Sequence, residues 1–424
     1  MLSEPARTLR PPDWLQALRA PALQAPVRLH GWRDIAMQVA LAALGVVLPF
    51  SSAGVSVALG AIVLLAVCSA PQLWRTAAWR EPVAMLGLLL FAYILLHTVI
   101  TAALTGADVG VVNKYHELLL FPLLLAAMVA ISRPEPFVWG LAAGCVGYAL
   151  AHWATVFEPA LAEELARRRI SAGFCLAVTA HVFLHLGGRR AWIWRLIAAL
   201  LAITVLLRID GRTGQVILLV LATLAVWRRA PGHWRHAALV GVPLALLTVA
   251  LLSPPVKIRM METVDGLATL RLDTGTSTSI RLALLINSWT VATSHQPLGV
   301  GFSRFAEFHE PVARQRLARE PAWKPENASW EVLANNPHNE YLMQLAGGGA
   351  AALALFLAWL AAPALRRDRN GRMSPALSGV VLAFAVACLF NSLLMDFTEG
   401  HFYMAMLAWL LAHERRHAVA SEAP

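Results

Sequence analysis

The chain has 424 residues, of which 58% are hydrophobic and only 14% are charged. Soluble domains usually carry about 25% charged residues, so this composition excludes an ordinary soluble protein and indicates an integral membrane protein. The formal net charge of +10 would suit a nucleic-acid partner, but much of it comes from Arg residues that flank apolar segments, where cations set membrane orientation. A nucleic-acid-binding function is therefore not favoured.

Apolar runs that approach the length of a membrane-spanning helix recur along the chain. We predict about twelve transmembrane helices from them. In chain order they are residues 35–50, 53–70, 82–104, 114–131, 136–157, 170–186, 191–207, 213–226, 237–252, 338–360, 375–397 and 399–412. The predicted fold class is an all-α polytopic membrane protein with one large polar loop.

That loop divides the chain into three predicted regions. Residues 1–253 form an N-terminal arm and the first nine helices, residues 254–337 form the loop with amphipathic helices, and residues 338–424 form the last three helices and a tail. Because Lys and Arg near short loops stay on the cytoplasmic side, the Arg-rich termini are predicted to be cytoplasmic. Alternation then places the loop, with segments 158–169, 210–214 and 396–399, on the opposite face.

The first candidate site residues are cations on that opposite face. Arg167, Arg168 and Arg169 lie where the orientation rule predicts few positive charges, so an anionic ligand is expected there. Lys114 begins a predicted span and is more often an interfacial anchor than a site residue, although ionisable groups at membrane depth are frequently functional.

Arg212 lies in a glycine-flanked turn, Asp210-Gly211-Arg212-Thr213-Gly214, between two predicted spans. The glycines would let the backbone approach a ligand closely, and the planar Arg side chain can bind a phosphate through two hydrogen bonds. The alternative is an interfacial Arg that pairs locally with Asp210.

Arg281 lies in a stretch with helical periodicity, residues 280–289, inside the polar loop. An amphipathic helix at the interface would carry Arg281 towards the other cations. The alternative is a solvated charge on that helix.

His338 is predicted at the start of the span that follows the loop. Asn336 is a suitable N-cap and Pro337 suits the first helical position, which would place His338 in the first turn, near the positive end of the helix dipole. That field disfavours the imidazolium ion, and a neutral imidazole is what a general base needs near neutral pH. The alternative is a capped helix start with an interfacial His.

Three further residues are possible supporting members of the site. Asn339 and Tyr341 lie close to His338 in the sequence, with Tyr341 one turn away on the same helix face. Asp396 lies in the last predicted outer turn and is more often an interface or cap residue. The sequence contains no P-loop, no zinc motif and no close Asp pair in the outer loops, so neither a metal nor another cofactor is predicted.

These features, taken in order, resemble the O-antigen ligase and polymerase family, and the bacterial O-antigen ligases in particular. They are the large outer loop before the tenth span, the glycine turn with Arg212, the loop helix with Arg281 followed by Pro-Leu-Gly-Val-Gly at 297–301, and Pro-His-Asn-Glu-Tyr-Leu at 337–342. The specific part of the resemblance runs from 212 to 341. The turn has Gly211 before the Arg, where many members have Ser.

The resemblance implies a multi-pass glycosyltransferase of the GT-C class in the bacterial inner membrane, with its active site on the periplasmic face. Its donor would be O-antigen on undecaprenyl diphosphate and its acceptor a sugar hydroxyl of lipid A core, so the product is completed lipopolysaccharide. The resemblance further implies His338 as general base and Arg212 and Arg281 as diphosphate-binding residues, with no metal. Transfer by a single displacement predicts inversion. Arg167, Arg168 and Arg169 are candidates for binding acceptor phosphates.

Three alternatives stay open. An O-antigen polymerase shares much of the pattern but commonly has two sizeable outer loops, and only one is predicted here. A protein O-oligosaccharyltransferase of the same family is usually longer at its C-terminus. A lipid-glycan flippase or transporter would be expected to have paired halves and broken helices near the midplane, which the sequence does not indicate.

Overall fold

The computed structural model describes residues 27–158, 160–269, 277–319, 332–366 and 373–420, and every regular element in these ranges is a helix. The long helices are α2 (Trp32–Val47), α3 (Ser52–Cys68), α5 (Pro82–Thr105), α6 (His116–Ala130), α7 (Glu135–Ala154), α9 (Arg169–Leu184), α10 (Ala191–Leu207), α11 (Arg212–Arg229), α12 (Arg235–Leu251), α13 (Pro254–Thr269), α14 (Ser277–Ser294), α15 (Phe305–Leu317), α17 (Glu340–Ala361), α18 (Pro375–Ala387) and α19 (Phe397–Ala420). Shorter elements are α4 (Ala70–Arg75), α8 (Ala160–Arg167), and the 3-10 helices η1 (Ala78–Arg80), η2 (Gly110–Tyr115), η3 (Gly232–Trp234) and η5 (Ala362–Leu365).

Each predicted apolar run coincides with one of these helices, so the prediction of an all-α membrane protein is confirmed. Five helical segments of the described chain are long and apolar enough to cross a bilayer, and the pair formed by α3 and the segment Ala70–Arg80, bent by 86°, can count as a sixth. Helices α9, α10 and α18 are apolar but shorter. The total of about twelve spans stays a prediction.

The predicted helix 375–397 is too long. α18 ends at Ala387, and the chain then turns over the start of α17, where the backbone N–H of Glu340 donates to the carbonyl of Cys388 at 2.8 Å. The carboxylate of Glu340 accepts from the backbone N–H of Leu394 at 2.9 Å. The apolar composition continues past residue 387, so hydropathy alone did not predict the end of the helix.

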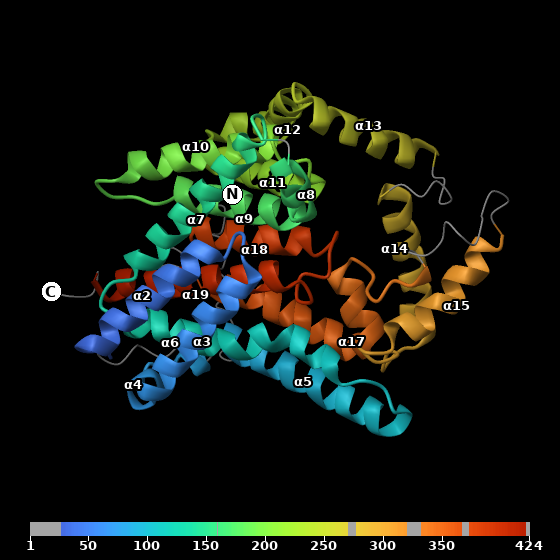
Figure 1. Ribbon diagram of the computed structural model, residues 1–424, viewed down its shortest axis with the longest axis horizontal. Coiled ribbons are helices and arrows are strands. Elements are labelled where there is room, and N and C mark those ends of the chain that lie inside the picture. The colour runs from blue at the N-terminus through green and yellow to red at the C-terminus, as the bar shows by residue number, and fades with distance from the viewer. Residues whose placement is uncertain (1–26, 159, 270–276, 320–331, 367–372, 421–424) are drawn as a thin grey trace, which may run out of the picture.

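The helices pack around α19 and α18, which lie at the centre of the bundle (Figure 1). Residues 401–412 of α19 are all buried, and α19 packs on α6 and α9. Around this centre, α2 packs on α7, α9 on α10 and α11, and α5 on α17.

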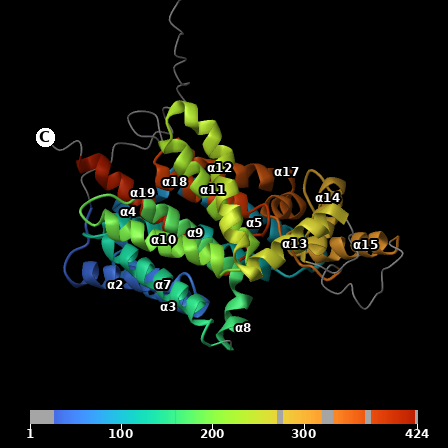
Figure 2. The same ribbon diagram turned by 90° about the horizontal axis from the view of Figure 1, so that it is seen from above.

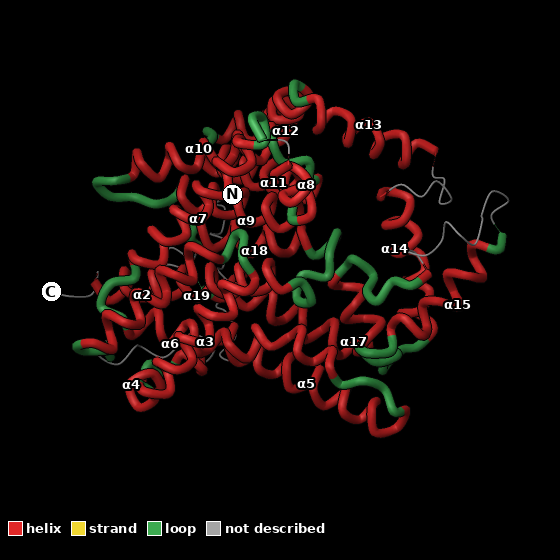
Figure 3. Tube along the Cα trace, viewed as in Figure 1, coloured by secondary structure: helices red, strands yellow, loops and turns green. Residues whose placement is uncertain are grey.

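The polar segment between α12 and α17 is not an extended loop but consists largely of the helices α13, α14 and α15. These lie together at one end of the bundle (right in Figure 1), and the view from above shows them at the same end (Figure 2). Helix α4 and the loop that leads into α10 lie at the opposite end, where that loop is seen at the far left of Figure 3. The segments predicted to lie on different faces of the membrane are therefore at different ends of the molecule.

Candidate functional site

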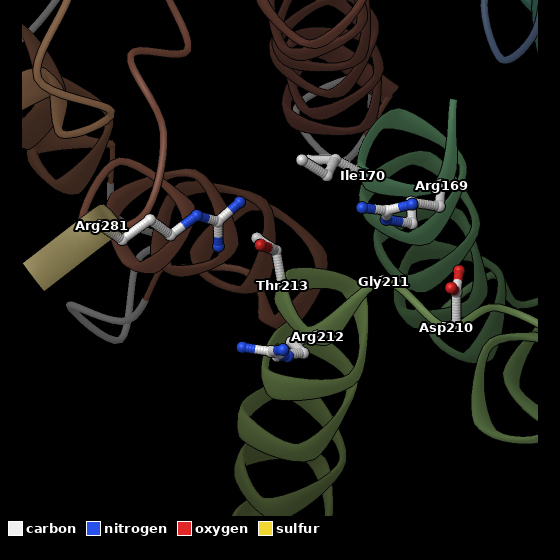
Figure 4. A pocket seen from close by; sticks show the side chains of 7 residues that line it. All are labelled: Arg169, Ile170, Asp210, Gly211, Arg212, Thr213 and Arg281. Atoms are coloured by element: carbon white, nitrogen blue, oxygen red, sulfur yellow. The ribbon is translucent and has the colours of Figure 1, made fainter. Parts of the chain in front are cut away.

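A pocket at the end of the bundle near α13 and α14 is lined by side chains from three separate parts of the chain. Helix α9 contributes Arg169 and Ile170, the turn between α10 and α11 contributes residues 210–213, and α14 contributes Arg281. The pocket has about 340 Å³ of space, part of it open to solvent. In Figure 4 the guanidinium groups of Arg169 and Arg281 point towards each other from opposite sides, with Arg212 below them.

Glycines bring α9 and α11 into direct backbone contact beside this pocket. A Cβ atom added to Gly214 would lie 2.4 Å from the Cα of Gly173, and one added to Gly211 would lie 2.6 Å from the carbonyl oxygen of Arg169. No side chain fits at such distances, so these positions require glycine. These glycines make room for α9, and Gly211 also lines the pocket, so the prediction that the glycines let the backbone approach a ligand stays a prediction.

Arg212 begins α11 and reaches into the polar segment. Its Nη1 donates to the hydroxyl of Thr278 at 2.6 Å, and its Nη2 forms an ion pair with Glu262 at 3.4 Å. Only 22% of the Arg212 side chain is exposed. The contacts join α11 to α13 and α14, so the loop helices are held against the pocket.

Arg281 forms no hydrogen bond or ion pair with any residue that the structure describes. Burial lowers the pKa of its guanidinium, and the charges of Arg212 and Arg169 lower it further. Arg169 donates only a long 3.4 Å hydrogen bond to the carbonyl of Ala166. Three guanidinium groups that repel one another around one pocket favour binding of an anion, and a phosphate can accept several of their N–H groups at once.

His338 lies just before α17, not inside it. Helix α17 begins at Glu340 with Asn339 as its N-cap, so the predicted cap at Asn336 and the predicted first position at Pro337 are wrong. Asn336 instead accepts a hydrogen bond from the backbone N–H of His338 at 2.9 Å. His338 has a φ of 47°, a left-handed conformation that non-glycine residues seldom adopt.

The His338 side chain is exposed to solvent on one side and shielded by protein on the other. This partial burial lowers the pKa of the imidazole, and the positive charge of Arg281 lowers it further. His338 does not line the pocket itself. Arg281 therefore links the two parts of the site, since it lines the pocket and acts electrostatically on the imidazole.

Two of the possible supporting residues have structural contacts. The hydroxyl of Tyr341 donates to the carbonyl of Ala385 at 2.8 Å, and the amide of Asn339 donates to the carbonyl of Leu389 at 3.1 Å. Both contacts tie the start of α17 to α18 and to the chain that follows it.

The other two supporting residues interact with each other. Asp396 is partly buried, and burial raises its pKa above the ordinary value while the charge of Lys114 opposes that shift. Neither residue lines the arginine pocket.

The Arg167–Arg169 run is divided among three environments. Arg167 ends α8 and forms an exposed ion pair with Glu163 at 3.3 Å. Arg168 separates α8 from α9 and donates to the carbonyl of Phe50 at 2.7 Å. Only Arg169 lines the pocket.

Several partners in and below the site were not identified from the sequence. Glu262 and Thr278 bind the side chain of Arg212. Ser171, two residues after Arg169 in α9, donates its hydroxyl hydrogen to the buried carboxylate of Glu399 at 2.7 Å. Ser171 could have been suspected, because it lies near the polar start of an otherwise apolar helix. Within the described ranges no group of three His, Cys, Asp or Glu side chains is arranged to hold a metal ion.

Comparison with known proteins covers part of this site, since the α9 residues Arg169 and Ile170 lie outside the matched region. Residues 196–357 match the sequence model of the family described as O-Antigen ligase. The search of curated proteins found no match. The matched segment extends from within α10 into α17 and includes Arg212, Arg281 and His338. Over residues 196–357, this chain is therefore similar to the O-antigen ligase family.

Proposed function

We propose that this chain is a metal-independent inverting glycosyltransferase that moves O-antigen polysaccharide from undecaprenyl diphosphate to a sugar hydroxyl of lipid A core. The reaction would take place on the periplasmic face of the bacterial inner membrane and complete the lipopolysaccharide. The observation that carries the proposal is the convergence of Arg169, Arg212 and Arg281 on one pocket, with His338 within the electrostatic range of Arg281. The family match supports the reaction class.

The chemistry needs one proton acceptor and one group of cations. His338 accepts the proton of the acceptor hydroxyl as its oxygen bonds to the anomeric carbon of the donor sugar. The bond from that carbon to the diphosphate oxygen breaks in the same step, and the electron pair leaves with the diphosphate. Attack opposite to the leaving group inverts the anomeric configuration.

The arginines stabilise the negative charge that develops on the departing diphosphate. Arg212 and Arg281 bind it, and Arg169 adds a third cation to the two predicted from the sequence. Arg suits this task because it stays charged and its planar group matches two phosphate oxygens. Removal of one such contact typically costs about 3 to 4 kcal/mol in transition-state stabilisation.

Arg167 and Arg168 remain our candidates for the acceptor. They lie next to the pocket in the chain, and the exposed side chain of Arg167 and the partly exposed side chain of Arg168 are suited to contact phosphates of a second lipid. Asp396 and Lys114 are proposed to support the site electrostatically.

The decisive experiment is expression of the chain in a bacterium that lacks its own O-antigen ligase. The wild type should restore long O-antigen ladders on lipid A core, and His338→Asn should abolish them at equal protein level. Asn tolerates a positive φ, so the backbone is preserved while the base is lost. His233→Asn, at an exposed His of η3, is the matched control and should restore ladders.

The same experiment separates the ligase from the polymerase, which the family match also supports. If the chain lengthens glycans on the lipid carrier but none reaches lipid A, it is a polymerase. Ladders that persist in His338→Asn would refute the role of the imidazole.

A further inference from the structure

Helix α17 is broken in its middle. Gly349 has φ 71° and ψ −167°, a backbone conformation that essentially only glycine adopts, and it separates two helical segments at a kink. A break of this kind removes backbone hydrogen bonds within the helix, and the freed groups need partners.

The loop 297–301 supplies those partners. The backbone N–H of Val300 donates to the carbonyl of Ala346 at 2.7 Å, and that of Gly301 donates to Gly347 at 2.8 Å. In the other direction, the N–H of Ala350 donates to the carbonyl of Pro297 at 3.1 Å. The loop is therefore hydrogen-bonded to α17 on both sides of the break.

Close contacts leave no room for side chains between the two backbones. A Cβ atom added to Gly349 would lie 1.9 Å from the carbonyl oxygen of Pro297, and one added to Gly299 would lie 2.6 Å from that of Ala346. Helix α5 also binds the backbone beside the break, since the Tyr93 hydroxyl donates to the carbonyl of Gly348 at 2.7 Å.

The two segments joined here carry two residues of the site. Arg281 is in the second turn of α14, which packs against α17 and ends at Ser294, just before the loop. His338 precedes α17. Arg281 lies roughly 20 Å along α14 from the end of that helix, at 1.5 Å per residue. A tilt of about 3° at the loop would move Arg281 by roughly 1 Å over a helix of this length.

We propose that the loop 297–301, seated in the break of α17, fixes the position of Arg281 relative to His338, and that Gly299 and Gly349 are positioning residues for the reaction. The inference rests on the proposed roles of Arg281 and His338. It assigns a task to the Pro-Leu-Gly-Val-Gly motif, which touches neither substrate pocket nor base.

Gly349→Ala tests the proposal in purified protein supplied with lipid-linked donor and lipid A core. The added methyl group would push the loop away, and we expect turnover to fall about 100-fold, the size of effect that a 1 Å misplacement can produce. The low-pH limb of the rate profile should move to higher pH, because Arg281 no longer depresses the pKa of His338 to the same degree. A general loss of folded protein would lower the rate without moving this limb.

Two further variants complete the design. Gly60→Ala, in α3 with nothing within 4 Å of the added atom, is the matched control and should behave as wild type. Tyr93→Phe removes one hydrogen bond to the break without adding an atom, and should give a smaller shift of the limb in the same direction.

A distance measurement gives a readout that does not depend on activity. Spin labels on Ile286 and Asn335, both exposed, would be compared in wild type and Gly349→Ala after Cys68, the exposed cysteine, is replaced by Ser. The proposal expects a shifted or broadened distance distribution. An unchanged distance distribution together with an unchanged rate profile would overturn the proposal about the loop. In that case, inactivity of His338→Asn in the same assay would still support the proposed function.

Discussion

At the scale of single residues, His338 has two properties that suit a general base. Its left-handed backbone is held by Asn336, so the direction of the side chain is set locally. Its pKa lies below the ordinary value because of partial burial and the charge of Arg281. A base with a lowered pKa is neutral, and therefore active, over a wider range of acidic pH.

The contribution of Arg281 to this pKa gives a testable pH dependence. In Arg281→Gln the charge is lost, so the pKa of His338 should rise, and the low-pH limb of the rate profile should move to higher pH. The maximal rate should also fall, by about 100-fold, because a diphosphate contact is lost. The measurement is the initial rate across pH 5 to 8, about the range in which His titrates.

Arg212→Gln is the control for that experiment. It removes a cation from the same pocket, whereas the pKa of His338 is lowered by burial and by the charge of Arg281. Its rate should fall without movement of the limb. Equal movement in both variants would contradict a specific effect of Arg281 on the imidazole.

The residue type pointed to two of the three cations that line the pocket, while their roles stay predictions. Arg212 and Arg281 were identified as candidate phosphate ligands, and the structure brings them together. Arg169 was grouped with its neighbours in the sequence, because nothing in the residue types indicates that the chain changes direction at Arg168, between α8 and α9. The cap was misplaced because Asn336 and Asn339 are equally good N-cap residues by type.

At the scale of helices, the crossing of α9 and α11 determines the spacing of two cations. Both helices begin at the pocket, with Arg169 and Arg212 as their first residues. Their contact at Gly173 and Gly214 falls within the first five residues of each helix. The distance between the cations is therefore set by the absence of side chains at these glycines.

Gly214→Ala should separate the two helices. The added methyl group meets backbone atoms of α9, which cannot move aside alone, so we expect a loss of about 1 to 3 kcal/mol in stability, as for other overpacked cores. Donor binding should weaken as Arg169 moves away. Thermal unfolding in detergent and titration with undecaprenyl diphosphate would measure the two effects.

The matched control is Gly147→Ala in α7, where an added Cβ has nothing within 4 Å. It should change neither quantity. If Gly214→Ala unfolds at the wild-type temperature and binds donor equally well, the crossing does not set the site.

The apolar helices were predicted from the sequence, since long apolar runs need to form helices in a bilayer. What hydropathy did not predict was irregular backbone inside apolar sequence. The end of α18 at Ala387 and the break at Gly349 both fall in apolar stretches. The run Gly347-Gly348-Gly349 was the available signal for the break, because consecutive glycines weaken a helix.

At the scale of the whole molecule, a buried ion cluster joins distant parts of the chain at the end opposite the site. Glu81, which is fully buried before α5, accepts hydrogen bonds from Arg366 at 2.5 Å and from Arg415 at 2.6 Å. Burial opposes ionisation of this carboxylate, but the two Arg side chains outweigh it and hold the pKa of Glu81 below its ordinary value.

Glu81→Gln should destabilise the protein by about 3 kcal/mol, because it leaves Arg415 buried without its counter-charge. A depressed carboxyl pKa stabilises the fold above the ordinary Glu pKa, and this contribution is lost as the pH falls through the folded-state value. The difference in unfolding temperature between wild type and variant should therefore be largest at neutral pH and shrink in acid.

Glu310→Gln, which breaks the more exposed pair with Arg314, serves as the reference and should shift the unfolding temperature little. The rate of glycosyl transfer per folded molecule should be the same for Glu81→Gln and the wild type, since the cluster lies far from the pocket. A Glu81→Gln variant as stable as the wild type would show that the cluster does not stabilise the fold.

The central position of α19 has a consequence for biogenesis. The ribosome makes this helix after every other described helix, yet its residues 401–412 occupy the middle of the bundle. The helices inserted earlier cannot complete their packing until α19 leaves the translocon and inserts among them. Quality-control proteases would then meet an open, incomplete assembly for most of synthesis, and a nascent chain stalled before α19 would be a ready substrate for them.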